Sequence, residues 1–207
     1  MRATRARSGA VAHTVVAVGR SPRPQFPNAT YHVTARGVAR RALFRDDDDR
    51  SAFALLFGCV LDRRGWICHS ACVLTTHYHL LVETVEADLA AGMQWLNGLF
   101  AKTSNDRYGE KGHVFEARYG SDLVLTDAHF MATVRYIALN PVRAGLCRRP
   151  EDWVWGSYGA TLDASAPWPF PVSDEILDQF GDQRSKALEG LRQFVESGLD
   201  ERASRAA

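Results

Sequence analysis

The sequence predicts an α+β protein built on a ferredoxin-like, split βαβ antiparallel sheet, with one additional helix. Segments of strand-like and helix-like periodicity follow one another in the order β-α-β-β-α-β-α. That order is the split βαβ arrangement, in which two helices cover one face of the sheet. The length of 207 residues, of which 46% are apolar and 24% charged, suits one folded domain with appendages.

The first strand and the first helix come early in the chain. Tyr31–Ala35 is rich in β-branched and aromatic residues, which is typical of a strand. Asp46–Asp49 then mark a helix start, because carboxylates are favoured at the positive end of the helix dipole. Apolar residues follow at helical spacing, namely Phe53, Leu56, Phe57 and Val60, and Gly65 ends the helix. We therefore interpret the acidic run as a solvated helix N-terminus and not as a metal cluster.

A hairpin and a second helix follow. Trp66–Leu74 and His77–Glu83 are predicted strands joined by the short turn at Thr75 and Thr76. A second amphipathic helix is expected at about Leu89–Tyr108. Its apolar stripe consists of Met93, Leu96, Leu99 and Phe100.

The last predicted elements of the domain are a fourth strand within 114–125 and a third helix over about 127–140. Thr126 or Asp127 is the candidate N-cap of this helix. Pro141 disfavours helical geometry in the residue before it, so we expect the helix to stop there. The third helix is free to lie over the other face of the sheet or over its edge.

The chain divides into three predicted parts. Residues 1–26 are interpreted as a flexible basic tail, or an over-extended gene start, because they hold five arginines, no acidic residue and no periodicity. A signal peptide is the alternative, although no small-residue cleavage site follows the apolar patch. Residues 27–162 form the main domain, onto which the aromatic patch 153–155 packs. Residues 163–207 are a linker and an acidic extension of one or two helices.

The net charge of +1 hides an uneven distribution. Residues 29–150 carry fifteen basic and thirteen acidic side chains, and four of these acids form one run. Such a pattern is expected if one face contacts phosphate. Nearly all the positive charge is arginine, which suits phosphate oxygens, but a GC-rich genome would produce the same bias.

Composition also excludes several classes of protein. The four cysteines are too few and too scattered for a disulfide scaffold. No apolar run approaches the roughly 18 residues of a membrane-spanning helix. We therefore expect a cytoplasmic protein that does not associate with membranes.

His77 and His79 form the most distinctive local motif. Alternate residues of a strand share a face, so the two imidazoles project side by side and can hold one divalent metal ion. Two histidines on a half-exposed strand, without any ligand role, are the alternative, and an isolated H-x-H motif favours that alternative.

Tyr136 and Asn140 add a second feature, since residues four apart on a helix share one face. Taken singly, Tyr136 would be a core aromatic and Asn140 a helix cap before Pro141. Together with the histidine pair they make a chemical set. A metal ion held by two imidazoles and an amide oxygen polarises a phosphodiester oxygen, and a tyrosine hydroxyl one turn away attacks the phosphorus.

Seven motifs occur in a fixed order between about residues 27 and 160: YHVTARG, FRDD, HYHLLVET, GMQWLNG, FEARYGS, RYIALNPVRAGL and W-x-W-x-S-Y. This series resembles the REP-associated tyrosine transposases, relatives of the single-tyrosine insertion-sequence transposases in the HUH superfamily. The resemblance implies the split βαβ fold, with His77, His79 and the polar Asn140 as metal ligands and Tyr136 as the nucleophile. It also implies a 5′-phosphotyrosine intermediate. Two departures are Thr76, where the family usually has asparagine, and Gly120, where relatives mostly carry lysine.

The resemblance further implies single-stranded DNA with palindromic hairpins as the partner, and either a monomer or a homodimer. Mg²⁺ or Mn²⁺ is the expected ion, because the substrate offers hard phosphate oxygens. Candidate DNA-binding residues are Arg36, Arg40, Arg41, Arg118, Tyr119, Arg135 and Arg143. Tyr119 is also a rival nucleophile, but only Tyr136 shares a helix with a candidate ligand.

Other candidate sites are weaker. Cys68 and Cys72 share a face of the predicted second strand, but a spacing of four separates their thiols by roughly 13 Å, too far to share an ion. His69, His113 and His129 have no partner at ligand spacing and are expected to be surface or core residues.

We therefore predict a transposase-type DNA endonuclease and strand transferase that acts on single-stranded DNA beside hairpins. The alternative is a domesticated protein that binds hairpin DNA as a regulator, without turnover. The presence of the histidine pair, Tyr136 and Asn140 favours the enzyme, since a non-catalytic descendant is free to lose any of them.

Overall fold

A four-stranded antiparallel sheet, in the spatial order β2-β3-β1-β4, forms the centre of the protein. Its strands are β1 (Ala29–Arg36), β2 (Ile67–Val73), β3 (His77–Thr84) and β4 (Gly120–Leu123). Each central strand lies between two strands that are consecutive in sequence, β3 between β1 and β2 and β1 between β3 and β4, as the split βαβ arrangement requires. The predicted fold class is confirmed.

These elements come from a computed structural model that describes residues 24–169 and 172–206. The predicted tail, residues 1–26, lies outside the described residues except for its last three, and so does the alternative of a signal peptide. None of the helices in the described ranges is both long and apolar enough to span a membrane.

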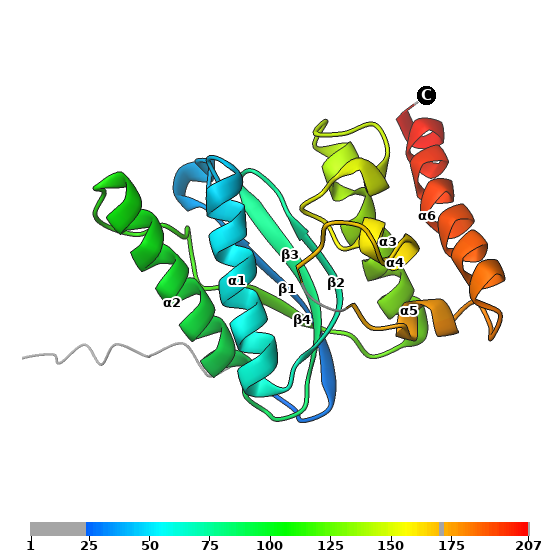
Figure 1. Ribbon diagram of the computed structural model, residues 1–207, viewed down its shortest axis with the longest axis horizontal. Coiled ribbons are helices and arrows are strands. Elements are labelled where there is room, and N and C mark those ends of the chain that lie inside the picture. Colours follow the sequence, from blue (N-terminus) through cyan, green and yellow to red (C-terminus); the bar gives the residue numbers. More distant parts are fainter. Residues whose placement is uncertain (1–23, 170–171, 207) are drawn as a thin grey trace, which may run out of the picture.

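Helices α1 (Asp47–Arg64) and α2 (Leu89–Tyr108) cover one face of the sheet (Figure 1). Strand alternation supplies the sheet's side of this first core, and the predicted apolar stripes of the two helices supply the rest. Its buried residues include Tyr31, Val33, Phe44, Phe53, Phe57, Tyr78, Leu80, Met93, Leu96 and Phe100. Burying each such aromatic or aliphatic side chain is worth roughly 1.5–3 kcal/mol.

The N-terminus of α1 is the predicted acidic run. The side chain of Asp46 accepts a hydrogen bond from the backbone N–H of Asp49 at 3.0 Å, which caps the helix. Arg107, in the last turn of α2, forms ion pairs with Asp46, Asp48 and Asp49. Asp47 pairs instead with Arg50 at 3.0 Å. The four carboxylates thus contact the helix end and two arginines, as is usual at a helix N-terminus.

Helix α3 (Asp127–Arg143) covers part of the opposite face, over β2 and β3, and α6 (Arg184–Ala206) packs outside it (Figure 1). This second core is buried between the sheet, α3 and α6. Its members include Cys72, Leu74, Leu81, Phe130, Val134, Ile137, Leu139, Leu177, Leu191 and Val195. The third helix therefore lies over the sheet's other face.

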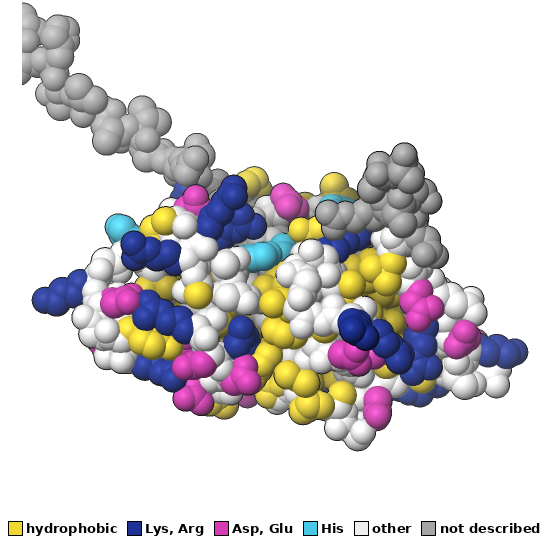
Figure 2. Space-filling model, turned by 90° about the horizontal axis from the view of Figure 1, so that it is seen from above, with side chains coloured by type: hydrophobic (Ala, Val, Ile, Leu, Met, Phe, Trp, Pro, Cys, Tyr) yellow, Lys and Arg dark blue, Asp and Glu magenta, His cyan; other side chains and the backbone are white. Residues whose placement is uncertain are grey.

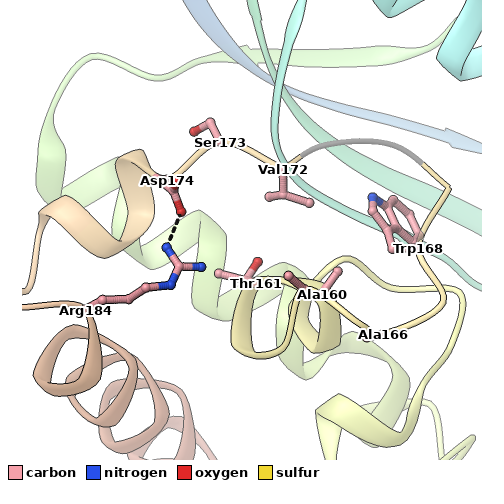
Figure 3. Close-up of a pocket in the computed structure, with 9 residues that line it drawn as sticks. Ala160, Thr161, Ala166, Trp168, Val172, Ser173, Asp174 and Arg184 are labelled. Carbon is pink, nitrogen blue, oxygen red and sulfur yellow. Dashed lines mark hydrogen bonds and ion pairs between the residues drawn. The ribbon is translucent and has the colours of Figure 1, made fainter.

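Two short helices connect α3 to α6: α4 (Tyr158–Leu162) and α5 (Glu175–Asp178). Asp174 pairs with Arg184 at 2.8 Å, which ties the start of α5 to the start of α6 (Figure 3). The surrounding segment borders a cavity of about 370 Å³ lined by residues that include Thr161, Trp168 and Ser173.

The aromatic patch 153–155 packs beside β2, as expected. The backbone N–H of Val73 donates to the carbonyl of Trp155, and the indole N–H of Trp153 donates to the carbonyl of Val73. Residues 155–157 therefore cover the outer edge of β2, while the short 3₁₀ turn Pro150–Asp152 packs between α3 and α4.

One predicted strand is confirmed in a shorter form, and one predicted boundary is wrong. The fourth strand lies within the expected range 114–125, but only Gly120–Leu123 pairs with β1, and Phe115 adds a single bridge to Gly37. The preceding residues instead form a loop that turns the rings of Phe115 and Tyr119 into the first core.

The third helix does not stop before Pro141 but continues to Arg143, with Asn140 in helical geometry. Proline removes only its own N–H from the helix, and the turn beyond it is held by other bonds. The N–H of Ala144 donates to the carbonyl of Asn140, and the N–H of Leu146 donates to the carbonyl of Pro141.

Candidate active site

The two motif histidines share the face of β3 that α1 and α2 leave uncovered. The ring centroids of His77 and His79 lie 5.1 Å apart, edge to face. Tyr78, between them, points into the first core, where it is fully buried and donates to the side-chain oxygen of Asn97 at 2.7 Å. Strand alternation thus places the pair as the sequence predicted.

A third histidine, His32 on β1, completes the group. Strand β1 pairs with β3 so that His32 lies opposite Leu81 and diagonal to His79. Nε2 of His32 lies 3.0 Å from Nδ1 of His79, and the two rings stack with centroids 5.2 Å apart. Sequence reasoning missed this residue, although the polar alternation of His32, Thr34 and Arg36 in a strand predicted to neighbour β3 was an available signal.

Tyr136 approaches the histidines from α3. Its ring centroid lies 5.2 Å from that of His79 and 5.8 Å from that of His32, edge to face in both cases. The side chain is 42% exposed, so its hydroxyl can meet a substrate from solvent. Arg143 lies seven residues after Tyr136, at the end of the same helix, and its guanidinium is 5.7 Å from the Tyr136 ring centroid. The structure therefore brings the predicted nucleophile and the predicted ligand pair together.

The imidazoles are kept neutral by their surroundings. Burial, followed by the neighbouring His32, His77 and Arg36, lowers the pKa of His79 to about 3. Burial also lowers the pKa of His32 and of His77. Neutral rings keep a lone pair that can bind a metal ion.

The hydrogen bonds of these rings fit a divalent ion. Nε2 of His79 is buried and has no hydrogen-bond partner among the described residues. Nδ1 of the same ring faces His32, and Nδ1 of His77 lies 2.9 Å from the hydroxyl of Thr76. Metal-binding histidines commonly use one nitrogen for the ion and fix the other by such a hydrogen bond. His77 and His79 would hold the ion, and Thr76 and His32 would orient them.

A cavity of about 400 Å³ lies in front of these groups, a volume typical of ligand sites. His32, His77, His79 and Tyr136 line it together with Arg36 and Arg118. Figure 2 views the molecule from this end of the sheet and shows histidine side chains at the surface close to arginine or lysine side chains. Two of the predicted DNA-binding arginines therefore border the cavity.

Asn140 and Arg135 lie elsewhere on α3. Asn140 is buried, does not line the cavity, and donates its side-chain amide to the carbonyl of Tyr136 at 2.9 Å. Arg135 lies against α6, with its guanidinium 4.8 Å from the ring centroid of Phe194 and 3.3 Å from the hydroxyl of Ser197. The structure does not bring either residue to the cavity.

The remaining predicted DNA contacts differ in exposure. Arg40 and Arg41 are exposed in the turn after β1, beyond Arg36. Tyr119 is buried in the first core, which makes it a poor candidate for direct contact with DNA. The glycine at position 120, where a lysine was noted as usual, is explained by packing. A Cβ at this position would lie 2.8 Å from the hydroxyl oxygen of Thr34.

Two statements made from the sequence are wrong: that Cys68 and Cys72 share a face of the strand, and that His69 has no partner. A bulge between Cys68 and Ser70 breaks the alternation of β2, so Cys68 faces the first core and Cys72 the second, on opposite faces. Burial raises the pKa of both thiols, that of Cys68 to about 12, which makes them inert. His69 does have partners: Ser173, Glu83 and Glu175.

Comparison with known proteins identifies the class and then the family. The sheet and the helices that cover it match the fold of a solved transposase structure. The chain also matches the model of "Transposase IS200 like" proteins over residues 25–140, more than half of its length. It therefore belongs to the IS200-like transposase family and is a transposase, a DNA-processing enzyme. No curated protein matches the sequence.

One of the solved structures that match this chain supports the fold. A REP-associated tyrosine transposase bound to a REP hairpin is 18% identical and superposes with a TM-score of 0.60, covering 76% of this chain and 94% of its own. A candidate transposase from Deinococcus radiodurans is 16% identical, with a TM-score of 0.40 over 57% of this chain and 93% of its own. A tRNA(His) guanylyltransferase from Saccharomyces cerevisiae is 9% identical, with a TM-score of 0.43 over 83% and 74%.

Proposed function

We propose that this transposase cleaves and rejoins single-stranded DNA through a covalent phosphotyrosine on Tyr136. The observation that carries the proposal is the meeting of the exposed Tyr136 ring with His79, 5.2 Å apart, in a cavity that His77 also lines. In this proposal residues 27–162 form the catalytic domain and residues 163–207 are an extension.

The reaction exchanges one phosphodiester for another. The Tyr136 hydroxyl oxygen bonds to phosphorus while the bond from phosphorus to the 3′ oxygen breaks, which leaves a 5′-phosphotyrosine and a free 3′-hydroxyl. The phenolic proton leaves to solvent through the open cavity, and the leaving 3′ oxygen takes up one proton from the same solvent. Mg²⁺ or Mn²⁺ on His77 and His79 would polarise the phosphate and offset its developing charge. In the structure the side-chain amide of Asn140 donates to the carbonyl of Tyr136. A role for Asn140 as the third metal ligand therefore rests on the family resemblance alone.

Arginine at the cavity supports a nucleic-acid strand as substrate. Arg36 and Arg118 line the cavity beside the histidines and can contact successive phosphates of a flexible strand. The structural similarity to a REP-associated transposase bound to a REP hairpin supports DNA that carries a palindromic hairpin. The same similarity leaves both a monomer and a homodimer open.

Covalent trapping tests the proposal. A fluorescent strand with a hairpin is incubated with the protein and Mn²⁺, and the products are resolved on a denaturing gel. The wild-type chain should form a covalent adduct, whereas Tyr136→Phe should lose it and still shift the DNA in a native gel, since the exposed ring is retained. Tyr119→Phe is the matched control and should keep the adduct.

Three outcomes would count against the proposal. A nucleotide found on the Tyr119 peptide would move the nucleophile. Undiminished cleavage by His77→Ala and His79→Ala variants at limiting Mn²⁺ would remove the metal assignment. A wild-type chain that shifts the strand but never links to it would favour the hairpin-binding regulator.

A further inference from the structure

His69 lies at the centre of a second polar cluster, away from the catalytic cavity. The cluster joins three elements: His69 on β2, Glu83 on β3 and Glu175 on α5. Each side chain offers one ligand atom, and the three atoms lie within 4.8 Å of one another. Among the described residues, this is the one group of three His, Cys, Asp or Glu side chains that converges so closely.

Only one of the two ring nitrogens of His69 has a hydrogen-bond partner among the described residues. Its side chain has no exposed surface. Nδ1 lies 2.8 Å from the hydroxyl of Ser173 and 3.3 Å from Oε2 of Glu175. Nε2 is buried without a hydrogen-bond partner among the described residues, and Oε2 of Glu83 stands 3.5 Å away. A buried ring nitrogen left without a hydrogen-bond partner destabilises the fold and is rare in folded proteins.

We propose that His69, Glu83 and Glu175 form a second divalent-cation site, distinct from the catalytic one. Two carboxylates that approach one buried ring are stabilised by a positive charge between them. The unpartnered Nε2 of His69 supplies the lone pair that a metal ion requires. The hydroxyl of Ser173 fixes Nδ1, and metal-binding histidines commonly have their other nitrogen held by such a hydrogen bond. One imidazole and two carboxylates suit Zn²⁺ or Mn²⁺, with water completing the shell.

A proton shared with the carboxylates is the alternative source of positive charge. Burial lowers the pKa of His69, against the opposing effects of Glu175 and Glu83, which favours the neutral ring. The side chain of Glu175 is 49% exposed, so an ion can reach the cluster from solvent. The arrangement therefore suits an exchangeable metal ion better than a buried imidazolium.

The position of this site gives it a structural consequence. Glu83 lies four residues beyond His79 on the same face of β3, roughly 13 Å along the strand. The ring of Phe130, near the start of α3, packs edge to face against His69 with centroids 5.1 Å apart. An ion here would fasten α5 to the sheet beneath the helix that carries Tyr136, and so stabilise the folded chain by binding it.

Metal stoichiometry tests this inference without any DNA. The tag-free, chelator-stripped chain is titrated with ZnCl₂ alone by calorimetry, and its melting temperature is followed in parallel. We expect two ions per wild-type chain. Glu175→Gln should lose one of them, with at least a tenfold fall in affinity at that site, and also the rise in melting temperature that this ion causes. Glu86→Gln, an exposed glutamate just beyond β3, is the matched control and should bind two.

The two sites can fail independently. A His77→Ala/His79→Ala double variant should keep one ion, and adding Glu175→Gln to it should leave none. If the double variant binds no zinc, or if its binding is unchanged by Glu175→Gln, the second site does not exist. One ion in the wild-type chain that is lost with the motif histidines would overturn the inference and leave the proposed function intact. Glu175→Gln keeps size and shape at a half-exposed position, and circular dichroism checks its fold.

Discussion

His32 should control the metal affinity of the catalytic histidines without binding the ion itself. It faces Nδ1 of His79 at 3.0 Å, and His79 is 5% exposed, so water cannot readily replace this contact. If Nδ1–H of His79 donates to His32, the opposite nitrogen keeps its lone pair for the ion. Removing such an outer partner weakens metal binding by about 10–100-fold, which is roughly 1.4–2.7 kcal/mol.

The assay is Mn²⁺ titration of the stripped chain in a Glu175→Gln background, so that only the catalytic site contributes. We expect His32→Ala to lose about 10–100-fold in affinity. His32→Gln, whose side-chain oxygen can accept the same hydrogen bond, should recover most of it. Thr34→Ala, on the same face of β1, is the control and should bind as the wild type does. Equal affinities for His32→Ala and the wild-type chain would refute the argument, and equal losses for the alanine and glutamine variants would reduce His32 to a packing residue.

Three further predictions concern stability and DNA binding. Gly98→Ala should stabilise α2 by roughly 0.5–1 kcal/mol, since a Cβ at this position meets nothing within 4 Å. Gly92→Ala should destabilise the chain, because a Cβ there would lie 2.3 Å from the Trp66 ring. Urea melts of the two variants and the wild-type chain test both expectations. Because the folded pKa of His79 is about 3 and its ordinary value is 6.5, the unfolded chain takes up the proton first. In the metal-free chain His79 alone should therefore lower the free energy of unfolding by about 1 kcal/mol per pH unit below 6.5, and His79→Gln should reduce the measured slope by that amount in urea melts between pH 7.5 and 5. Arg36→Gln should weaken single-strand binding and reduce the slope of log K against log salt by about 0.7, measured by fluorescence anisotropy.

The fold could be predicted because its elements have strong local signals. The apolar stripes of α1 and α2, the alternation in β1 and β3, and the acidic cap of α1 agree with the structure. The errors arise where tertiary packing overrides local preference. Within the range 114–125 predicted to hold the fourth strand, residues 114–119 form a loop instead, because the rings of Phe115 and Tyr119 pack into the first core. Pro141 was expected to end the third helix, yet the hydrogen bonds beyond it preserve the last turn.

The candidate site was only partly predictable, for reasons of register. The spacing of His77 and His79 fixes their common face within one strand. His32 is 47 residues from its partner His79, and the contact depends on which residues of β1 and β3 lie opposite each other. The bulge in β2 is also invisible in the sequence, and it reverses the side of the sheet that Cys68 faces. Glu175 reaches His69 from an element that no local pattern ties to the sheet.

The position of α3 explains why the polar chemistry gathers on one face of this sheet. α1 and α2 bury the other face in the first core, so a polar residue there would lose its hydration. α3 packs mainly on β2 and β3, which leaves the polar side chains of β1 beside the cavity. Phe130 and Tyr136 are six residues apart on this helix, about 9 Å of rise, and they contact His69 and His79 respectively. Because α6 packs on the outer side of α3, the C-terminal extension helps to hold Tyr136 over the histidines and is more than a separate appendage.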